Sequence, residues 1–274
     1  MRAFKFFFIL LCLTLYLCIG AIIRLVLFWA NSYTVIRVLN ALKYYLMHTF
    51  KAIAGLKVTV SGKKEILKEK GIFVISTHVG YLDGVILGSL IRGSFTTKEE
   101  IKKVPLLGKV VAIGGSIFID RKKKHKILEY VNHMSDRLNN GINIFNFPEG
   151  HATDGKKILS FFPAFFEAPL KTKSSIVPIT IDYERINGRP IKNYDNVYCY
   201  DGRSILKHLW NFLSFRSVDI SVKVHSKVGV SGFIADRKGR KAVSELCSQR
   251  LSAYKNLPIS LDHPFKRLSP SRRV

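Results

Sequence analysis

A histidine and an aspartate stand five residues apart in the segment ISTHVGYLDGVIL, as His78 and Asp83. Histidine is the side chain whose charge changes nearest to neutral pH, so it can take up a proton and return it. A carboxylate that accepts from one ring nitrogen fixes the tautomer and stabilises the protonated ring. The pair therefore predicts a general base, His78, that Asp83 orients.

The spacing of the pair indicates where each residue lies. Five residues on one continuous helix turn through about 500°, which places the two side chains on different faces. We therefore expect His78 in the loop after a strand at 71–76, and Asp83 in the first turn of the next helix. No serine or cysteine lies in an evident nucleophile turn, which favours direct transfer over a covalent enzyme intermediate.

Further positions along the chain accompany the pair. Arg121 ends the segment GGSIFIDR, and its forked guanidinium suits a phosphate group. Glu149 and Gly150 form the tip of a turn in FPEGHATDG, directly after the apolar run INIFNF. Pro178 stands inside SIVPITIDY, where a residue without an N–H predicts an edge strand or a bulge.

Alternating strand and helix patterns carry these positions after residue 52. Short apolar or β-branched runs predict strands at 58–62, 71–76, 116–120, 142–147, 175–183, 196–200 and 219–228. Helix patterns lie between or after them, at 82–91, 124–138 and 236–254. This alternation predicts an α/β fold with a single mixed sheet covered by helices.

The N-terminal segment predicts a membrane anchor. Residues 6–23 carry no charge and reach about 27 Å as a helix, close to the thickness of a hydrocarbon core. The apolar core is too long for a signal peptide, so we expect the segment to remain uncleaved. Residues 35–50 are amphipathic, so a transmembrane helix and a helical hairpin in one leaflet both stay open. Basic residues flank both ends and do not decide the orientation.

Charge and cysteine content narrow the classes of partner. The chain has 44 lysines and arginines against 19 acidic residues, a net charge of +25, which favours anionic partners such as lipid headgroups or phosphates. The aromatic residues fall mainly in apolar runs, which argues against a nucleic-acid binder. The four cysteines show no metal-ligand spacing, so we expect reduced thiols, no metal site and a cytoplasmic face.

The composition along the chain predicts three parts. Residues 1–52 form the membrane anchor, residues 53–257 the catalytic domain, and residues 258–274 a basic, proline-containing tail.

The order and spacing of these motifs resemble the glycerophospholipid acyltransferase family, specifically its bacterial 1-acyl-sn-glycerol-3-phosphate acyltransferases. The resemblance covers roughly residues 55–230 and implies the acyltransferase fold. It implies that His78 is the general base with Asp83 as its partner, and that Arg121 binds the phosphate of the acceptor.

The remaining motifs carry substrate-binding roles by the same resemblance. Glu149 and Gly150 match the third motif, and Pro178 matches the fourth motif, which is linked to the acyl donor. The donor would be acyl-CoA or acyl carrier protein, used as a substrate, with no further cofactor. The implied product is phosphatidic acid, made from lysophosphatidic acid in phospholipid biosynthesis at the cytoplasmic side of a bacterial inner membrane.

Departures from the family pattern bear on the acceptor. Many members have Thr-Arg-Ser after Pro-Glu-Gly, with the arginine as a phosphate ligand, whereas this chain has Ala152 at the arginine position. A lysine found further along in many members is Phe162 here. Lys98, Lys156 and Lys157 are candidate substitutes, since flexible ammonium groups bind phosphate as point charges.

Two alternatives to the lysophosphatidic acid reading stay open. The Thr-Asp-Gly segment at 153–155 resembles family branches that acylate lyso-ornithine lipid, so another lyso-lipid is the second candidate acceptor. A non-catalytic tether on the membrane surface is the other alternative, although such a protein would not need His78 and Asp83.

Overall fold

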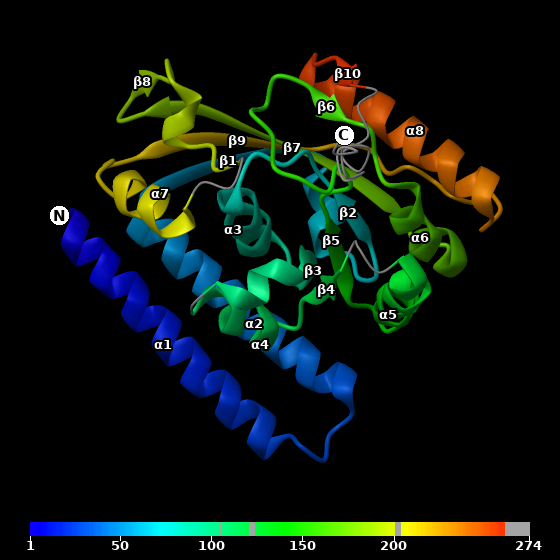
Figure 1. The fold of residues 1–274 in the computed structure, drawn as a ribbon, viewed down its shortest axis with the longest axis horizontal. Helices are drawn as coiled ribbons and strands as arrows, with labels where there is room; N and C mark the ends of the chain where they lie inside the picture. Colours follow the sequence, from blue (N-terminus) through cyan, green and yellow to red (C-terminus); the bar gives the residue numbers. More distant parts are fainter. Residues whose placement is uncertain (105, 121–123, 201–203, 261–274) are drawn as a thin grey trace, which may run out of the picture.

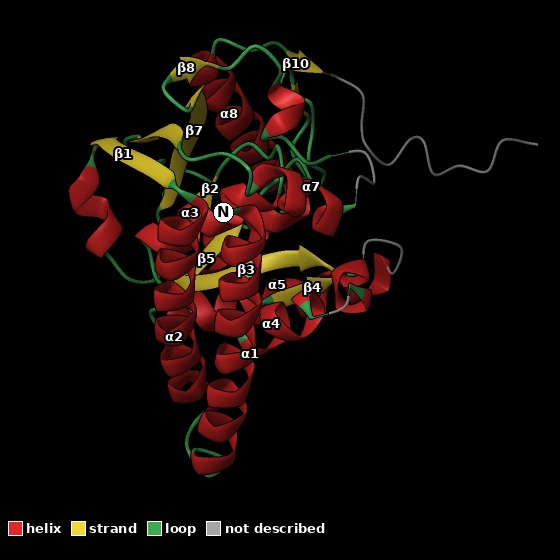
Figure 2. Ribbon diagram, turned by 90° about the vertical axis from the view of Figure 1, so that its left-hand side faces the viewer, coloured by secondary structure: helices red, strands yellow, loops and turns green. Residues whose placement is uncertain are grey.

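A computed structural model describes residues 1–104, 106–120, 124–200 and 204–260 of the chain. It begins with two long helices, α1 (Arg2–Val26) and α2 (Ser32–Ala54), which run side by side as a hairpin (Figure 1, Figure 2). Asn31 starts α2, because its side chain accepts a hydrogen bond of 2.8 Å from the N–H of Tyr33. Among the described helices, α1 is the one long and apolar enough to cross a membrane.

The body of the protein is built on a mixed sheet whose strands do not follow chain order (Figure 1). From edge to edge the order is β1 (Leu56–Gly62), β9 (Val218–Val224), β7 (Ile176–Ile186), β2 (Phe73–Ile75), β5 (Asn143–Asn146), β3 (Gly93–Lys98) and β4 (Ile117–Ile119). Short strand β8 (Arg189–Pro190) pairs with β7, and a separate two-stranded sheet joins β6 (Ile158–Leu159) to β10 (Ile259–Ser260). The predicted mixed α/β fold is confirmed, with this small second sheet added to it.

The direction of the strands brings three loops together. β7, β2, β5, β3 and β4 are parallel neighbours, whereas β9 is antiparallel to β7. Parallel neighbours end at the same edge of a sheet, where α/β proteins place their ligand sites. The segments that follow β2, β5 and β3 therefore meet at one edge.

Helices cover both faces of the sheet because the side chains of its strands alternate between them. Val74 of β2 packs into the core beneath α3 (Tyr81–Leu90) and α7 (Ile205–Phe212). Its neighbours Phe73 and Ile75 pack into the opposite core. The helices on that second side are α5 (Ile127–Asn139), α6 (Glu167–Thr172) and α8 (Arg237–Lys255). A further helix, α4 (Leu107–Ile113), packs against α1.

Short 3₁₀ turns connect several of these elements, at Lys64–Lys68, Glu99–Lys103, Lys124–Lys126, Pro163–Phe166 and Tyr194–Asn196. The predicted boundary after residue 52 stays a prediction, although α2 ends close to it, at Ala54. The proposed tail begins at residue 258, where residues 258–260 lead into β10, and residues 261–274 lie outside the described part of the chain.

Two strand predictions differ from the structure. Residues 196–200 were predicted as a strand, but they follow a 3₁₀ turn and lie against the loop after β2, where the Cys199 N–H donates to the Val79 carbonyl at 2.9 Å. β3 was not predicted, because its sequence GSFTTK has a single large apolar residue, Phe95. Pairing with β5 on one side and β4 on the other makes it a strand.

Pro178 was predicted to mark an edge strand or a bulge. The edge strand is wrong, because Pro178 lies in the interior strand β7, opposite Ile75 at the end of β2. A bulge is present beside it, because the register on the β9 side shifts by one residue between Ile179, opposite Val224, and Ile176, opposite Val228. The Pro178 carbonyl accepts from the N–H of His225, which follows the last residue of β9. Because the N–H and the carbonyl of one residue point to the same neighbouring strand, the missing N–H faces the position just past β9. The proline therefore interrupts little of the regular ladder.

A buried lysine connects α2 to the sheet and to α4 by hydrogen bonds. Lys43 is 4% exposed, and its ammonium donates to the Asn40 side chain at 2.8 Å and to the carbonyls of Gly93 at 2.6 Å and Gly114 at 3.0 Å. Burial, with a smaller contribution from the charge of Arg137, lowers the pKa of Lys43 to about 7. The Gly93 and Gly114 carbonyls fix the hairpin against the start of β3 and the end of α4, while Asn40 is a partner within α2 itself.

The variant Lys43→Met tests the contribution of these hydrogen bonds, because methionine keeps an apolar stem but leaves the carbonyls of Gly93 and Gly114 without their donor. Each unsatisfied buried acceptor costs about 1–3 kcal/mol, so we expect the free energy of unfolding to fall by about 2–5 kcal/mol. Chemical denaturation in detergent measures the loss. Lys238→Met, at an exposed position of α8, is the control and should change it by about 0.5 kcal/mol or less. Equal stability of the two variants would contradict the role of Lys43.

Candidate active site

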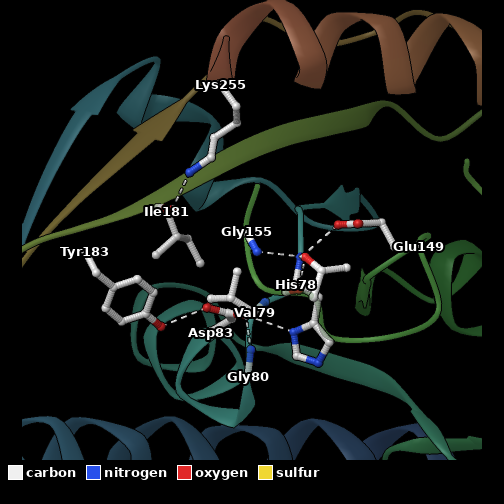
Figure 3. Close-up of polar contacts among 10 residues, drawn as sticks. His78, Val79, Gly80, Asp83, Glu149, Gly155, Ile181, Tyr183 and Lys255 are labelled. Carbon is white, nitrogen blue, oxygen red and sulfur yellow. Dashed lines mark hydrogen bonds and ion pairs between the residues drawn. The ribbon is translucent and has the colours of Figure 1, made fainter. Parts of the chain in front are cut away.

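His78 and Asp83 meet at the carboxyl end of β2 (Figure 3). His78 lies in the loop after β2 and Asp83 in the first turn of α3, as the spacing predicted. Nδ1 of His78 is 2.9 Å from Oδ2 of Asp83. Because the carboxylate accepts, Nδ1 carries the ring proton and Nε2 is left to act as the base.

Four donors hold the Asp83 carboxylate, which is 1% exposed. Oδ2 accepts from His78 and also from the N–H groups of Val79 at 2.8 Å and Gly80 at 3.1 Å, which caps the start of α3. Oδ1 accepts from the hydroxyl of Tyr183 at 2.8 Å. This set satisfies a carboxylate that would be costly to bury without partners.

Tyr183 is a site residue that the sequence did not single out. Burial raises the pKa of its phenol, and the charge of Asp83 adds to the effect, so the group stays a hydroxyl donor. Lys255, at the end of α8, donates to the Ile181 carbonyl at 2.8 Å and pairs with Asp182, which holds β7 beside Tyr183 (Figure 3). A tyrosine among the inward-facing apolar residues of this strand was the signal available in the sequence.

Glu149 is a buried residue that holds the backbone of the loop that carries His78. Its carboxyl group is buried and accepts from the N–H groups of His78 and Leu159, each at 3.0 Å. Burial raises the pKa of Glu149 to about 8, against the effect of these two donors. Gly150 follows at φ 76°, a left-handed conformation that suits glycine, and its N–H donates to the Phe147 carbonyl at 2.9 Å. Glu149 therefore positions the His78 loop against the Pro-Glu-Gly turn.

The ring of His78 packs on one face against another aromatic ring, and its side chain is partly exposed. It stacks on Phe147, with ring centroids 4.1 Å apart and planes at 19°. Its backbone carbonyl accepts from the N–H of Thr153 at 2.8 Å. The His78 side chain is 23% exposed while that of Asp83 is 1% exposed, so the histidine is the more accessible member of the pair.

A cavity of about 860 Å³ opens beside His78. Its polar end includes His78, Lys98, His151, Thr153 and Lys157. The rest is lined mainly by apolar side chains of the hairpin, α3 and α4, among them Ile9, Leu13, Leu46, Phe50, Val85 and Val110. The site therefore combines a hydrogen-bonded histidine–aspartate pair with a largely apolar cavity.

The predicted substrate-binding residues fall in different places. Gly150 and Lys157 line the cavity with His78. The Lys156 side chain is 84% exposed and lies 3.8 Å from Asp154, outside the set of described residues that line the cavity.

The remaining two predicted residues are Pro178 and Arg121. Pro178 lies in β7, outside the described cavity lining, and its link to the acyl donor stays a prediction. Arg121 lies outside the described residues. Within the described ranges, no cluster of histidine, cysteine, aspartate or glutamate is arranged to hold a metal ion.

The buried carboxyl of Glu149 predicts a pH dependence of stability. Its pKa in the folded protein, about 8, lies above the ordinary value of 4.5. Stability from the protonated form is therefore fully present below about pH 4.5 and is lost as the pH rises toward about 8. Glutamine does not titrate, so the free energy of unfolding of the wild type minus that of Glu149→Gln should fall over this range. Denaturation curves at several pH values measure the difference, and a constant difference would refute the assignment.

Comparison with known proteins shows what the segment that carries this site is similar to. A model of the acyltransferase family matches residues 57–182, which include both His78 and Glu149. A lyso-ornithine lipid O-acyltransferase of Rhizobium meliloti is 28% identical over 73% of this chain and 69% of its own length. A 1-acyl-sn-glycerol-3-phosphate acyltransferase of Neisseria gonorrhoeae is 26% identical over 62% of this chain and 66% of its own length.

A solved structure shares the fold. The 1-acyl-sn-glycerophosphate (LPA) acyltransferase PlsC of Thermotoga maritima superimposes with a TM-score of 0.60 at 21% identity, over 93% of this chain and 98% of that chain. The mixed sheet with its N-terminal helices is thus the fold of that enzyme. Residues 57–182 of this chain therefore match the acyltransferase domain.

Proposed function

We propose that this enzyme transfers a fatty acyl group from an acyl thioester to the free hydroxyl of a lyso-lipid. The observation that carries the proposal is the cavity, whose polar end contains His78 and whose apolar part extends beneath the hairpin. A largely apolar cavity with a few polar groups at one end suits a ligand with a long hydrocarbon chain and a reactive polar end.

The arrangement supports direct transfer from the donor to the acceptor, without a covalent acyl-enzyme intermediate. Nε2 of His78 takes the proton of the acceptor hydroxyl while the hydroxyl oxygen attacks the thioester carbonyl carbon. The Asp83 carboxylate stabilises the imidazolium through Nδ1, at 2.9 Å. When the tetrahedral intermediate collapses, the carbon–sulfur bond breaks and the leaving thiolate takes the proton from His78. The products are the ester and the free thiol.

The relatives and the residues at the cavity support two acceptors. Lysophosphatidic acid is the first candidate, because the relative from Neisseria gonorrhoeae carries that activity in its name and the protein is strongly basic. Lyso-ornithine lipid is the second, supported by the relative from Rhizobium meliloti and by Ala152 in place of an arginine. Acyl-CoA and acyl carrier protein are the candidate donors.

The hairpin supports action at a membrane surface. One side of α1 lines the cavity and its opposite side carries an exposed apolar stripe of Phe4, Phe8, Leu11, Leu15, Ile19 and Ile22. The turn between α1 and α2 projects beyond the body (Figure 2), and its Phe28 and Trp29 are 80% and 74% exposed. These features favour insertion of the turn into one leaflet. The cytoplasmic side of a bacterial inner membrane stays the predicted location of the active site.

An assay with purified protein tests the proposal. Labelled oleoyl-CoA is mixed with the protein and with lysophosphatidic acid, lyso-ornithine lipid, other lysophospholipids or 1-monooleoylglycerol. We expect time-dependent acylation of lysophosphatidic acid or lyso-ornithine lipid. Hydrolysis of the thioester without transfer to any lipid of the panel would overturn the proposal.

Replacing His78 by alanine should lower kcat by about 10²–10⁴-fold or more, since the residue serves as both base and acid. Asp83→Asn should also be severe, because an amide that donates to Nδ1 favours the wrong ring tautomer. Both variants should keep the circular dichroism spectrum of the wild type. Near-normal turnover by His78→Ala would exclude this mechanism.

Tyr183→Phe tests a positioning residue, because it removes one hydroxyl and keeps the ring. Loss of the 2.8 Å hydrogen bond to Oδ1 leaves the Asp83 carboxylate less firmly oriented. We expect kcat to fall about tenfold, the size of one charge-assisted hydrogen bond, with the KM for both substrates unchanged. Tyr198→Phe, whose ring centroid lies 5.7 Å from that of Tyr183, is the control and should be near normal. A Tyr183→Phe effect confined to KM would refute the positioning role.

A further inference from the structure

Helix α7 forms one apolar end of the cavity. It contributes three lining side chains, those of Ile205, Leu206 and Leu209. Trp210 of the same helix packs edge-on against Phe6 of α1, with ring centroids 5.3 Å apart, and Phe6 also lines the cavity. Lys5 donates to the carbonyl of Phe215, just after α7, at 2.8 Å. α7 is therefore fixed beside the N-terminal end of α1, and the lining here is the α7 end of the cavity (Figure 2).

A second apolar end lies farther along α1, where α4 packs (Figure 2). Leu13 of α1 lines the cavity there and packs with Leu46 of α2 and Val110 of α4, which also line it. Phe6 and Leu13 lie about 10 Å apart along the helix, at 1.5 Å per residue. The cavity therefore has a separate α4 end.

The two ends differ in exposure. Leu46 and Val110 at the α4 end are buried. Leu206 lines the cavity at the α7 end and is nevertheless 50% exposed, and Phe4 and Phe7 in the first turns of α1 are 66% and 61% exposed. The α7 end therefore opens at an apolar surface that continues into the exposed stripe of α1. A lipid that leaves a bilayer can enter this end with little of its chain passing through water.

The α7 end begins close to the catalytic histidine. Tyr81, three residues after His78, has its hydroxyl 3.0 Å from Nδ1 of His208 in α7. The Cys199 N–H donates to the Val79 carbonyl at 2.9 Å, and Cys199 lines the cavity. Both the start of α3 and the loop that carries His78 are thus in contact with α7 or with the segment that precedes it.

The proposed reaction brings two hydrocarbon chains to one base. The thioester carries the chain that is transferred, and the lyso-lipid keeps its own chain while its hydroxyl attacks. Each chain is stabilised by apolar surroundings, and the two cannot occupy the same space. The α4 end, lined by buried side chains, suits the donor chain, which arrives from water. The α7 end suits the chain of a lipid that arrives from a bilayer.

We propose that the α7 end binds the hydrocarbon chain that the acceptor lyso-lipid already carries. The inference rests on the proposed function and adds a second basis for choosing an acceptor, its chain as well as its headgroup. α7 spans Ile205–Phe212 and lies outside residues 57–182, which match the acyltransferase domain. This part of the acceptor specificity therefore belongs to the segment that follows the matched domain.

Photolabelling locates the chain directly. Lysophosphatidic acid and lyso-ornithine lipid, each with a diazirine in the middle of the hydrocarbon chain, are irradiated with the His78→Ala protein, and labelled peptides are identified by mass spectrometry. At least one probe should label α7, and an excess of the same unlabelled lipid should remove the label while an excess of oleoyl-CoA should not. Oleoyl-CoA with a diazirine in its chain should label α2 or α4 instead.

Three labelling results would overturn the proposal. One is acceptor label confined to α2 and α4, and another is acceptor label in α7 that oleoyl-CoA removes. The third is the absence of saturable label in α7 with both acceptor probes, which would leave the acceptor chain in the bilayer.

Steady-state kinetics in mixed micelles tests the same site in Leu206→Asn, which keeps the approximate size of the side chain but makes it polar. The KM for an acceptor with an oleoyl chain should rise roughly 3–10-fold, as expected for losing part of the apolar contact of one leucine. The KM values for oleoyl-CoA and for an acceptor with a hexanoyl chain should stay within about twofold. An equal rise for both acceptor chain lengths, or a rise for oleoyl-CoA alone, would contradict the assignment.

Lys207→Asn is the matched control, since Lys207 is the next residue of α7, is exposed and lies outside the described cavity lining. It should leave all three KM values within about twofold. The labelling also separates this inference from the proposed function. Saturable label in α7 of a protein that transfers no acyl group would end the proposed function and leave the chain site standing. Acyl transfer by the wild type without such label would end the chain site alone.

Discussion

The buried carboxylate of Asp83 is the interaction on which the active site depends. Its Oδ2 joins the ring of His78 to the first turn of α3, and its Oδ1 joins both to β7 through the hydroxyl of Tyr183. A carboxylate at 1% exposure is stable only when donors surround it, so the fold must deliver all of them together. The same requirement that satisfies the buried group also fixes the imidazole, which means that stability and orientation of the base have a common cause.

The second constraint is that the N-terminal hairpin has two roles, in lining the cavity and in contacting a membrane. α1 lines the cavity with one side and carries an exposed apolar stripe on the other. Lys43 holds α2 to the body with two hydrogen bonds, to the carbonyls of Gly93 and Gly114. A membrane that receives the exposed stripe would therefore lie next to the compartment that would take an acyl chain. In this account the hairpin positions the enzyme and forms part of its substrate site, so the two roles cannot be separated by deleting it.

Much of the fold was predictable because strands β2, β5 and β9 and helices α3, α5 and α8 each carry their own periodic pattern. The placement of His78 and Asp83 followed from the two elements that flank them. The contact between Tyr183 and Asp83 was not predictable in this way, since it joins residues 100 positions apart and depends on the order of strands in the sheet. β3 and the central position of Pro178 were missed for the same physical reason, because neighbouring strands decide them.

The central claim is that Asp83 holds His78 with its proton on Nδ1, so that Nε2 is free to accept the proton of the acceptor. Nitrogen-15 NMR of histidine-labelled protein measures this directly, with the His78 signal assigned by its loss in His78→Ala. The account predicts that the neutral ring is the Nδ1–H tautomer in the wild type and loses this preference in Asp83→Ala. A neutral His78 protonated on Nε2 in the wild type would contradict it.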